Sequence, residues 1–69
     1  MKVYKVESNN CGCSFFDIVC ANSGKEAIEV AFEYQDNDYL DISDLEAEEL
    51  EDLSANLEEP CVITGTYID

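Results

Sequence analysis

The sequence predicts a small α+β domain in which an antiparallel sheet of three or four strands packs with two helices and a metal ion staples the fold. Three observations lead to this class: short runs of strand-like residues, two helix-capping patterns, and four cysteines in a chain of 69 residues. A chain this short buries little apolar surface, so domains of this size often rely on a metal or a disulfide. We expect one zinc-stapled domain over residues 1–69.

Two segments at the start of the chain are predicted to pair as a β-hairpin. Residues 2–7 alternate in polarity, with Tyr4 and Val6 on one face. Residues 14–21 (SFFDIVCA) are rich in the β-branched and aromatic residues that favour strands. The residues between them, 8–13, are rich in turn formers and should make the connection.

The first helix is predicted from a capping pattern. Ser23 and Glu26 match Ser-x-x-Glu, in which the Ser hydroxyl and the Glu carboxylate accept hydrogen bonds from free amides at a helix start. We expect this helix to end near Tyr34. Its apolar residues recur at helical spacing and should pack on the sheet: Ala27, Ile28, Ala31 and Phe32.

A second helix and a final strand are predicted in the remaining sequence. The capping pattern recurs from Ser43, and Pro60 disfavours helical geometry at the residue before it, so this helix should end near Leu57. One arc of its helical projection carries the apolar residues Ile42, Leu45, Leu50, Leu53 and Leu57. Residues 39–42 fit either a short strand or the approach to this helix. Residues 61–68 (CVITGTYI) are typical of a strand.

The charge of the chain is strongly one-sided. It has 17 Asp and Glu against 3 Lys and Arg, a formal net charge of -14, and no basic residue follows Lys25. Such a surface repels nucleic acids and anionic membranes and attracts proteins rich in Lys and Arg. We therefore expect a basic protein partner, without direct binding of nucleic acid or membrane.

Carboxylates are predicted to line the second helix opposite its leucines and to continue from the loop before it. The candidate partner-binding residues are Asp36, Asp38, Asp41, Asp44, Glu48, Glu51, Asp52, Glu58 and Glu59. An ordinary solvated helix face mixes Glu with Lys, whereas this one accepts repulsion between like charges. Three interpretations stay open: a solvated face, a nucleic-acid mimic that competes for a basic groove, and docking on a basic patch elsewhere.

The four cysteines are predicted to bind a structural zinc ion. Cys11 and Cys13 flank a glycine in the predicted turn, and Cys20 and Cys61 would complete four thiolate ligands. A straight strand would, however, place Cys20 about 23 Å from Cys13, at 3.3 Å per residue. The alternatives are a bent strand, a site of Cys11, Cys13 and Cys61 with another ligand, and disulfides or buried free thiols in place of zinc.

Other functional classes find little support in the sequence. The chain has no His, no Cys-x-x-Cys pair and no Gly-rich phosphate loop, and its size predicts no pocket for a small-molecule substrate, so we do not expect an enzyme. No apolar run approaches the ~18 residues that a membrane span needs, and the first residues lack the apolar run of a signal peptide. These features predict a cytoplasmic protein.

The N-terminal half resembles a known type of protein. Residues 4–6 (YKV), the turn 11–13 (CGC), the short strand after it and residues 26–30 (EAIEV) are together similar to the opening of one family of phage-borne anti-CRISPR proteins that inhibit Cas9. The four cysteines are similar to those of a zinc-containing inhibitor of this type. The resemblance implies a phage protein that acts in the bacterial host, binds Cas9 and prevents loading or cleavage of target DNA. The alternatives are a DNA mimic aimed at a restriction nuclease or a DNA glycosylase, and a zinc-stapled scaffold protein without an inhibitory role.

Overall fold

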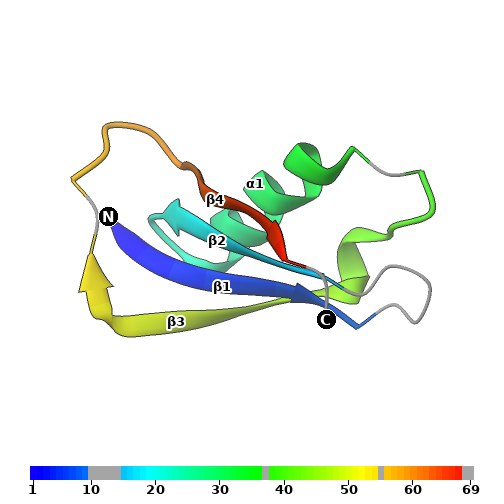
Figure 1. The fold of residues 1–69 in the computed structure, drawn as a ribbon, viewed down its shortest axis with the longest axis horizontal. Helices are drawn as coiled ribbons and strands as arrows, with labels where there is room; N and C mark the ends of the chain where they lie inside the picture. Colours follow the sequence, from blue (N-terminus) through cyan, green and yellow to red (C-terminus); the bar gives the residue numbers. More distant parts are fainter. Residues whose placement is uncertain (10–14, 37, 55, 68–69) are drawn as a thin grey trace.

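A four-stranded antiparallel sheet with one α-helix packed on it forms the part of the chain that the structure describes (Figure 1). The computed structural model describes residues 1–9, 15–36, 38–54 and 56–67, with side chains up to residue 63. The elements are β1 (Lys2–Ser8), β2 (Phe16–Ala21), α1 (Gly24–Gln35), a 3-10 turn (Ile42–Asp44), β3 (Leu45–Ser54) and β4 (Cys61–Tyr67). Neighbouring strands follow the order β3-β1-β2-β4. The α+β class and the sheet are confirmed.

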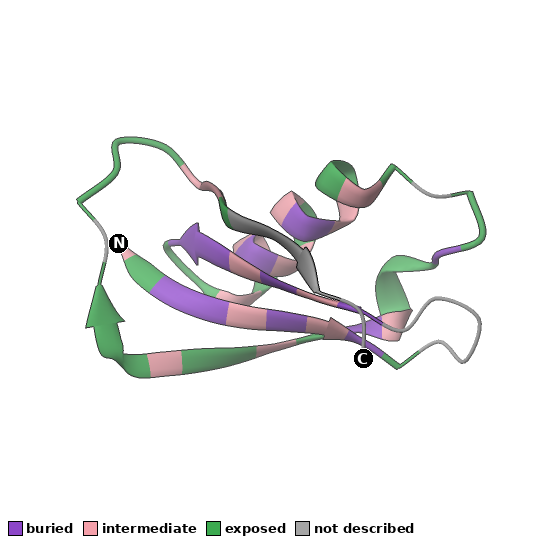
Figure 2. Cartoon of the chain, in the orientation of Figure 1, coloured by how far each residue is buried: buried purple, intermediate pink, exposed green. Residues whose placement is uncertain are grey.

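The predicted hairpin forms the centre of the sheet. β1 and β2 pair from Lys2 opposite Ala21 to Glu7 opposite Phe16, and the Ser8 N–H donates to the Phe15 carbonyl at 3.0 Å beyond the last pair. β3 then pairs with the free edge of β1 and β4 with that of β2. Because β1 and β2 each have a neighbour on both sides, they carry most of the buried sheet positions (Figure 2).

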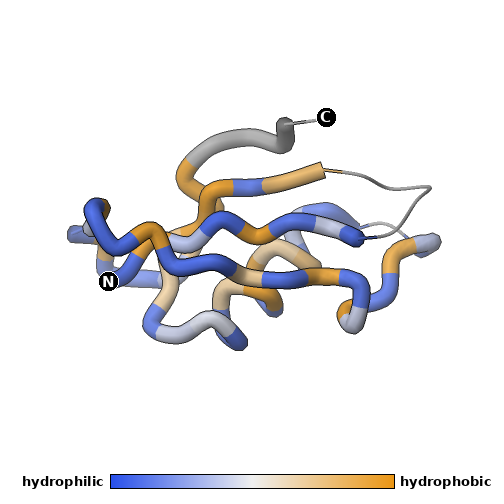
Figure 3. Tube along the Cα trace, turned by 90° about the horizontal axis from the view of Figure 1, so that it is seen from below, coloured by the Kyte–Doolittle hydropathy of each residue, from blue (hydrophilic) through white to orange (hydrophobic). Residues whose placement is uncertain are grey.

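The main core lies between α1 and the inner face of the sheet. The strands contribute Tyr4, Val6, Val19 and Ala21, the helix contributes Ala27 and Ala31, and the flanking segments contribute Phe15, Leu40 and Leu45. Ile28 and Phe32 pack against this cluster and are partly exposed. The predicted apolar face of the first helix is therefore confirmed. Figure 3 shows hydrophobic and hydrophilic residues interspersed along the sheet. At the start of β3, Leu45 and Ala47 face this core and alternate with exposed Glu46 and Glu48, whereas β2 carries apolar residues on both of its faces.

The start of α1 follows half of the predicted capping pattern. The Ser23 hydroxyl accepts a hydrogen bond from the Glu26 N–H at 3.2 Å, as expected. The Glu26 carboxylate reaches one residue further back, where it accepts from the Asn22 N–H at 2.8 Å and from the Asn22 side chain at 3.1 Å. The helix ends at Asp36, whose φ of 45° is left-handed and whose N–H donates to the Phe32 carbonyl at 3.4 Å.

The predicted second helix is wrong, because residues 45–54 form the strand β3. Leu45 is 5% exposed in the core, but Ile42, Leu53 and Leu57 are 44%, 54% and 45% exposed, so the predicted apolar arc does not exist. Residues 39–42 contain a turn and the start of the 3-10 turn and form no strand. The final strand β4 is confirmed, and it ends at Tyr67.

Two physical effects favour a strand over a helix for this acidic segment. Leu45 and Ala47 lie on one face of an extended chain and reach the core, and the free edge of β1 offers hydrogen-bond partners for the backbone. A strand also spreads ten residues over about 33 Å, whereas a helix would compress them into about 15 Å. The repulsion between the carboxylates is therefore lower in the extended form.

The face of the sheet away from α1 carries a second, smaller group of buried side chains. Val3 is 3% exposed and Cys20 is 0% exposed, and these two residues are register partners on β1 and β2. The Lys5 ammonium lies 4.8 Å from the centre of the Phe16 ring on the same strands, which is a cation–π contact. No helix in the described part of the chain has the length and hydrophobicity that crossing a bilayer requires.

Candidate functional site

The exposed strand β3 concentrates carboxylates along one edge of the sheet. Its acidic residues are all exposed, and we call them the acidic edge: Glu46, Glu48, Glu49, Glu51 and Asp52. Of the five residues of the acidic edge, only Glu49 has an ion pair with another described residue, with its Oε1 atom 3.5 Å from the Lys2 ammonium, and both side chains are well exposed to solvent. Exposed pairs of this kind contribute little energy. The acidic edge is therefore largely uncompensated.

The pairing of β3 with β1 is interrupted within the acidic edge. Tyr4 pairs with Glu49 and Lys2 pairs with Ser54, so two steps along β1 correspond to five steps along β3. The additional residues bulge from the regular ladder. A shallow, open pocket follows this bulge and is lined by Glu48, Glu49, Leu50, Glu51, Asp52 and Leu53. The bulge thus presents apolar and acidic side chains together.

The predicted carboxylate stripe is redistributed by this fold. Glu48, Glu51 and Asp52 lie on β3 as members of the acidic edge, and Glu58 and Glu59 lie exposed in the connection from β3 to β4. Helical projection missed Glu46 and Glu49, which share the same strand. The alternation from Leu45 to Glu48, apolar then acidic, was the signal that could have identified a strand.

The remaining predicted carboxylates lie between α1 and β3, and two of them have local structural roles. The Asp41 carboxylate accepts hydrogen bonds from the Ser43 N–H and hydroxyl, both at 3.0 Å. The Asp44 carboxylate accepts from the Asp41 N–H at 3.2 Å, which completes a reciprocal cap of the 3-10 turn. The Ser43 N–H, and secondarily the Ser43 hydroxyl, lower the pKa of the exposed Asp41 carboxyl.

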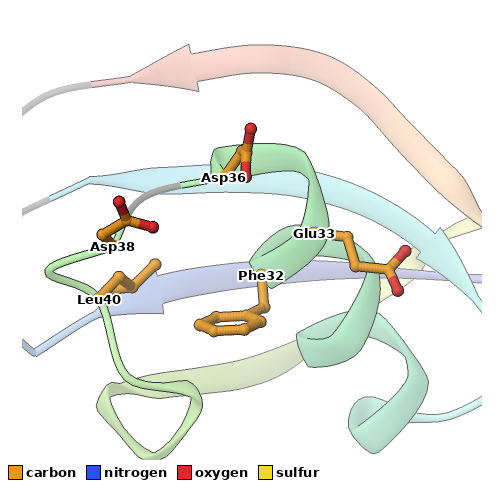
Figure 4. A pocket seen from close by; sticks show the side chains of 5 residues that line it. All are labelled: Phe32, Glu33, Asp36, Asp38 and Leu40. Carbon is orange, nitrogen blue, oxygen red and sulfur yellow. The ribbon is translucent and has the colours of Figure 1, made fainter.

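A small pocket lies at the end of α1 (Figure 4). Its apolar lining comes from Phe32 on the helix and Leu40 on the following loop, and its carboxylates come from Glu33, Asp36 and Asp38. In Figure 4 the side chains of Phe32 and Leu40 lie next to each other, while the three carboxylates spread over the surrounding rim. Two of the predicted partner-binding residues, Asp36 and Asp38, are thus placed around one apolar hollow.

The candidate residues do not form one patch, because β3 separates them along the molecule. The loop between α1 and β3 lies at one end of the sheet, and the connection from β3 to β4 lies at the other (Figure 1). The longest dimension of the molecule is 33 Å. A partner that contacts all of the candidates would have to follow β3 from end to end.

The described cysteines form a pair at one end of the sheet. Cys20 on β2 is the register partner of Cys61 on β4. Phe15, which closes the β1–β2 connection, lies at the other end of β2, about 17 Å from Cys20 at 3.3 Å per residue. Cys11 and Cys13 lie outside the described residues, and no group of three or more metal-binding His, Cys, Asp or Glu side chains occurs within them. A zinc site that unites all four cysteines stays a prediction.

Comparisons with models of protein families, with curated proteins and with solved structures found no match to this chain. The assignment of a function therefore depends on the chemistry of the described surface.

Proposed function

We propose that this protein is an inhibitor that binds a basic, nucleic-acid-binding protein through the acidic edge. The observation that carries the proposal is the exposed strand β3, which has five carboxylates and no basic residue. Carboxylates pair with Lys and Arg through charge-assisted hydrogen bonds. An extended row of negative charge also resembles, in its electrostatics, the backbone of a nucleic acid.

Protection of the sheet edge is a simpler role for charged residues on β3. Edge strands often carry charges that prevent pairing with another chain. Charges of either sign would serve that purpose, and Lys is especially common in it. The exclusive use of Asp and Glu from Glu26 onward therefore supports recognition of a positively charged partner beyond edge protection.

We propose guide-loaded Cas9 as the partner, following the resemblance of the N-terminal half to Cas9 inhibitors. Cas9 holds nucleic acid in a positively charged channel, which fits the sign of the acidic edge. The test is cleavage of target DNA by guide-loaded Cas9, with this protein added before or after the DNA. We expect loss of cleavage when the protein is added first. Unchanged cleavage in both orders, across several Cas9 subtypes, would refute Cas9 as the partner.

The role of the acidic edge is tested by matched charge reversals. Glu48→Lys with Glu51→Lys should weaken inhibition by about tenfold or more, because two attractive contacts become repulsive. Glu29→Lys with Glu33→Lys makes the same change in net charge on exposed positions of α1 and should change inhibition by less than about threefold. Equal losses in the two variants would show that net charge, and not this surface, governs binding.

A further inference from the structure

Cys20 and Cys61 are 41 positions apart in sequence and lie opposite each other on the adjacent strands β2 and β4. They are register partners in the antiparallel pair of β2 and β4. Opposed residues of antiparallel strands have Cα atoms about 4.5 to 5.5 Å apart. Disulfides span Cα distances of roughly 4.4 to 6.8 Å, so either kind of antiparallel pair is compatible with one.

The side chains of the two cysteines lie on the same face of the sheet. Their neighbours Val19 and Val62 are register partners that pack in or against the main core. Because side chains alternate along a strand, Cys20 and Cys61 point to the other face, away from α1. Cys20 is 0% exposed and its Sγ atom lies 3.4 Å from the Met1 Sδ atom, whereas Cys61 is partly exposed. A reagent in solution therefore reaches Cys61 first.

We propose that Cys20 and Cys61 form a reversible disulfide by exchange with a low-molecular-weight disulfide such as oxidised glutathione. The Cys61 thiol loses its proton to water, and the thiolate attacks the glutathione disulfide, which forms a mixed disulfide and releases one glutathione thiolate. The Cys20 thiol, after losing its proton, attacks the Cys61 sulfur and releases the second glutathione. Both protein thiols are oxidised by two electrons in total, and glutathione disulfide is reduced to two thiols.

The disulfide would fasten an edge strand to the centre of the sheet. β4 is joined to the sheet through β2 alone, and β2 belongs to the central hairpin. A crosslink at the first residue of β4 closes a long loop that contains α1 and β3, which lowers the entropy of the unfolded chain. The oxidised protein should therefore be more stable than the reduced protein, with the melting temperature raised by about 10 °C or more.

The pairing is tested on the full-length protein by mass spectrometry after oxidation with glutathione disulfide and blocking of free thiols. Cleavage before Asp17, Asp36 and Asp52 places Cys20 in the fragment 17–35, Cys61 in a C-terminal fragment, and Cys11 with Cys13 in the fragment 1–16. We expect a linked pair of the first two fragments, which reduction separates. A dominant link from fragment 1–16 to either of the others would overturn the proposal.

Two variants test the order of the exchange and its effect on stability. In the Cys20→Ser variant, Cys61 should keep one bound glutathione, because the Cys20 thiol that would displace it is missing. In the Cys61→Ser variant, Cys20 should stay unmodified because it is buried. Neither variant should show the rise in melting temperature on oxidation. If purified protein instead carries one equivalent of zinc and both cysteines oxidise only after a chelator removes it, the four-cysteine zinc site is correct and the proposal fails.

Discussion

Asp17 is a carboxylate buried beneath the last turn of α1, and its hydrogen bonding ties the helix to the sheet. The side chain is 0% exposed, and its Oδ2 atom accepts a hydrogen bond from the Gln35 side chain at 2.8 Å. The Oδ1 atom has no hydrogen-bond partner among the described residues. Buried carboxylates are costly unless they are paired, so the bond from Gln35 is an important contact of this helix end.

Replacing Gln35 should therefore destabilise the fold. Gln35→Ala removes the donor and leaves both carboxylate oxygens of Asp17 without a hydrogen bond from the described residues. This should lower the free energy of unfolding by about 1 to 3 kcal/mol. Chemical denaturation monitored by circular dichroism measures the change. Glu29→Ala, an exposed change on the same helix, serves as the control and should stay within about 0.5 kcal/mol. Equal effects of the two changes would show that the hydrogen bond from Gln35 to Asp17 does not stabilise the fold.

The Asp41 carboxyl gives a second prediction at the scale of one residue. Its pKa is lowered because the Ser43 N–H, and then the Ser43 hydroxyl, donate to the ionised form. Because the pKa of this carboxyl is lower in the folded state, its ionised form stabilises the protein. The full contribution is present at pH values above the carboxyl's pKa in the unfolded chain, and it is lost as the pH falls through the folded-state pKa. Ser43→Ala keeps the N–H and removes the hydroxyl.

We therefore expect the pKa of Asp41 to rise part of the way toward its ordinary value in Ser43→Ala. Carboxyl chemical shifts followed by NMR between about pH 2 and 6 measure this pKa, a range that covers the ordinary titration of Asp. Ser54→Ala, at an exposed position on β3, should leave it unchanged. A pKa that does not respond to Ser43→Ala would mean that the hydroxyl contributes nothing.

At the scale of elements, the strand β3 and a helix over the same residues predict different effects of replacing its leucines. Leu45 is 5% exposed and Leu53 is 54% exposed, although a helix would bury both on one face. Leu45→Ala should lower the free energy of unfolding by about 2 to 5 kcal/mol, as for other buried leucines. Leu53→Ala should cost about 0.5 kcal/mol or less. Similar large losses from both changes, measured by denaturation, would favour the helix.

At the scale of the whole molecule, the net charge of -14 opposes folding. The Debye length is about 30 Å at 0.01 M salt, so charges interact across most of the molecule, whose longest dimension is 33 Å. At about 1 M salt the Debye length falls to about 3 Å and the repulsion is screened. Salt should therefore stabilise the fold.

We expect the melting temperature at neutral pH to rise by several degrees between about 0.01 and 0.5 M NaCl, as screening replaces repulsion. Differential scanning calorimetry of the reduced protein measures it. Near the isoelectric point of about 4.1, where the net charge vanishes, the same addition of salt should have a much smaller effect. An effect of the same size at both pH values would indicate a response to salt that does not depend on charge.

Local patterns in the sequence were sufficient for several elements. The alternation around Tyr4 and Val6 fits a strand and not a helix, and the spacing of Ala27 and Ala31 after the Ser23 cap fits a helix and not a strand. These segments were placed correctly because short-range patterning and the final packing agree. The one-sided charge and the expectation of a basic partner also follow from composition alone.

Only the tertiary structure decided the form of residues 45–54 and the partners of the cysteines. The acidic segment contains both a helical capping pattern and strand alternation, and the free edge of β1 favours the strand by pairing with its backbone. Cys20 and Cys61 meet because β4 returns antiparallel beside β2, a long-range pairing that no local pattern encodes. Charge and periodicity are properties of the chain itself, whereas the neighbour of an edge strand depends on which backbone groups the rest of the fold leaves unpaired.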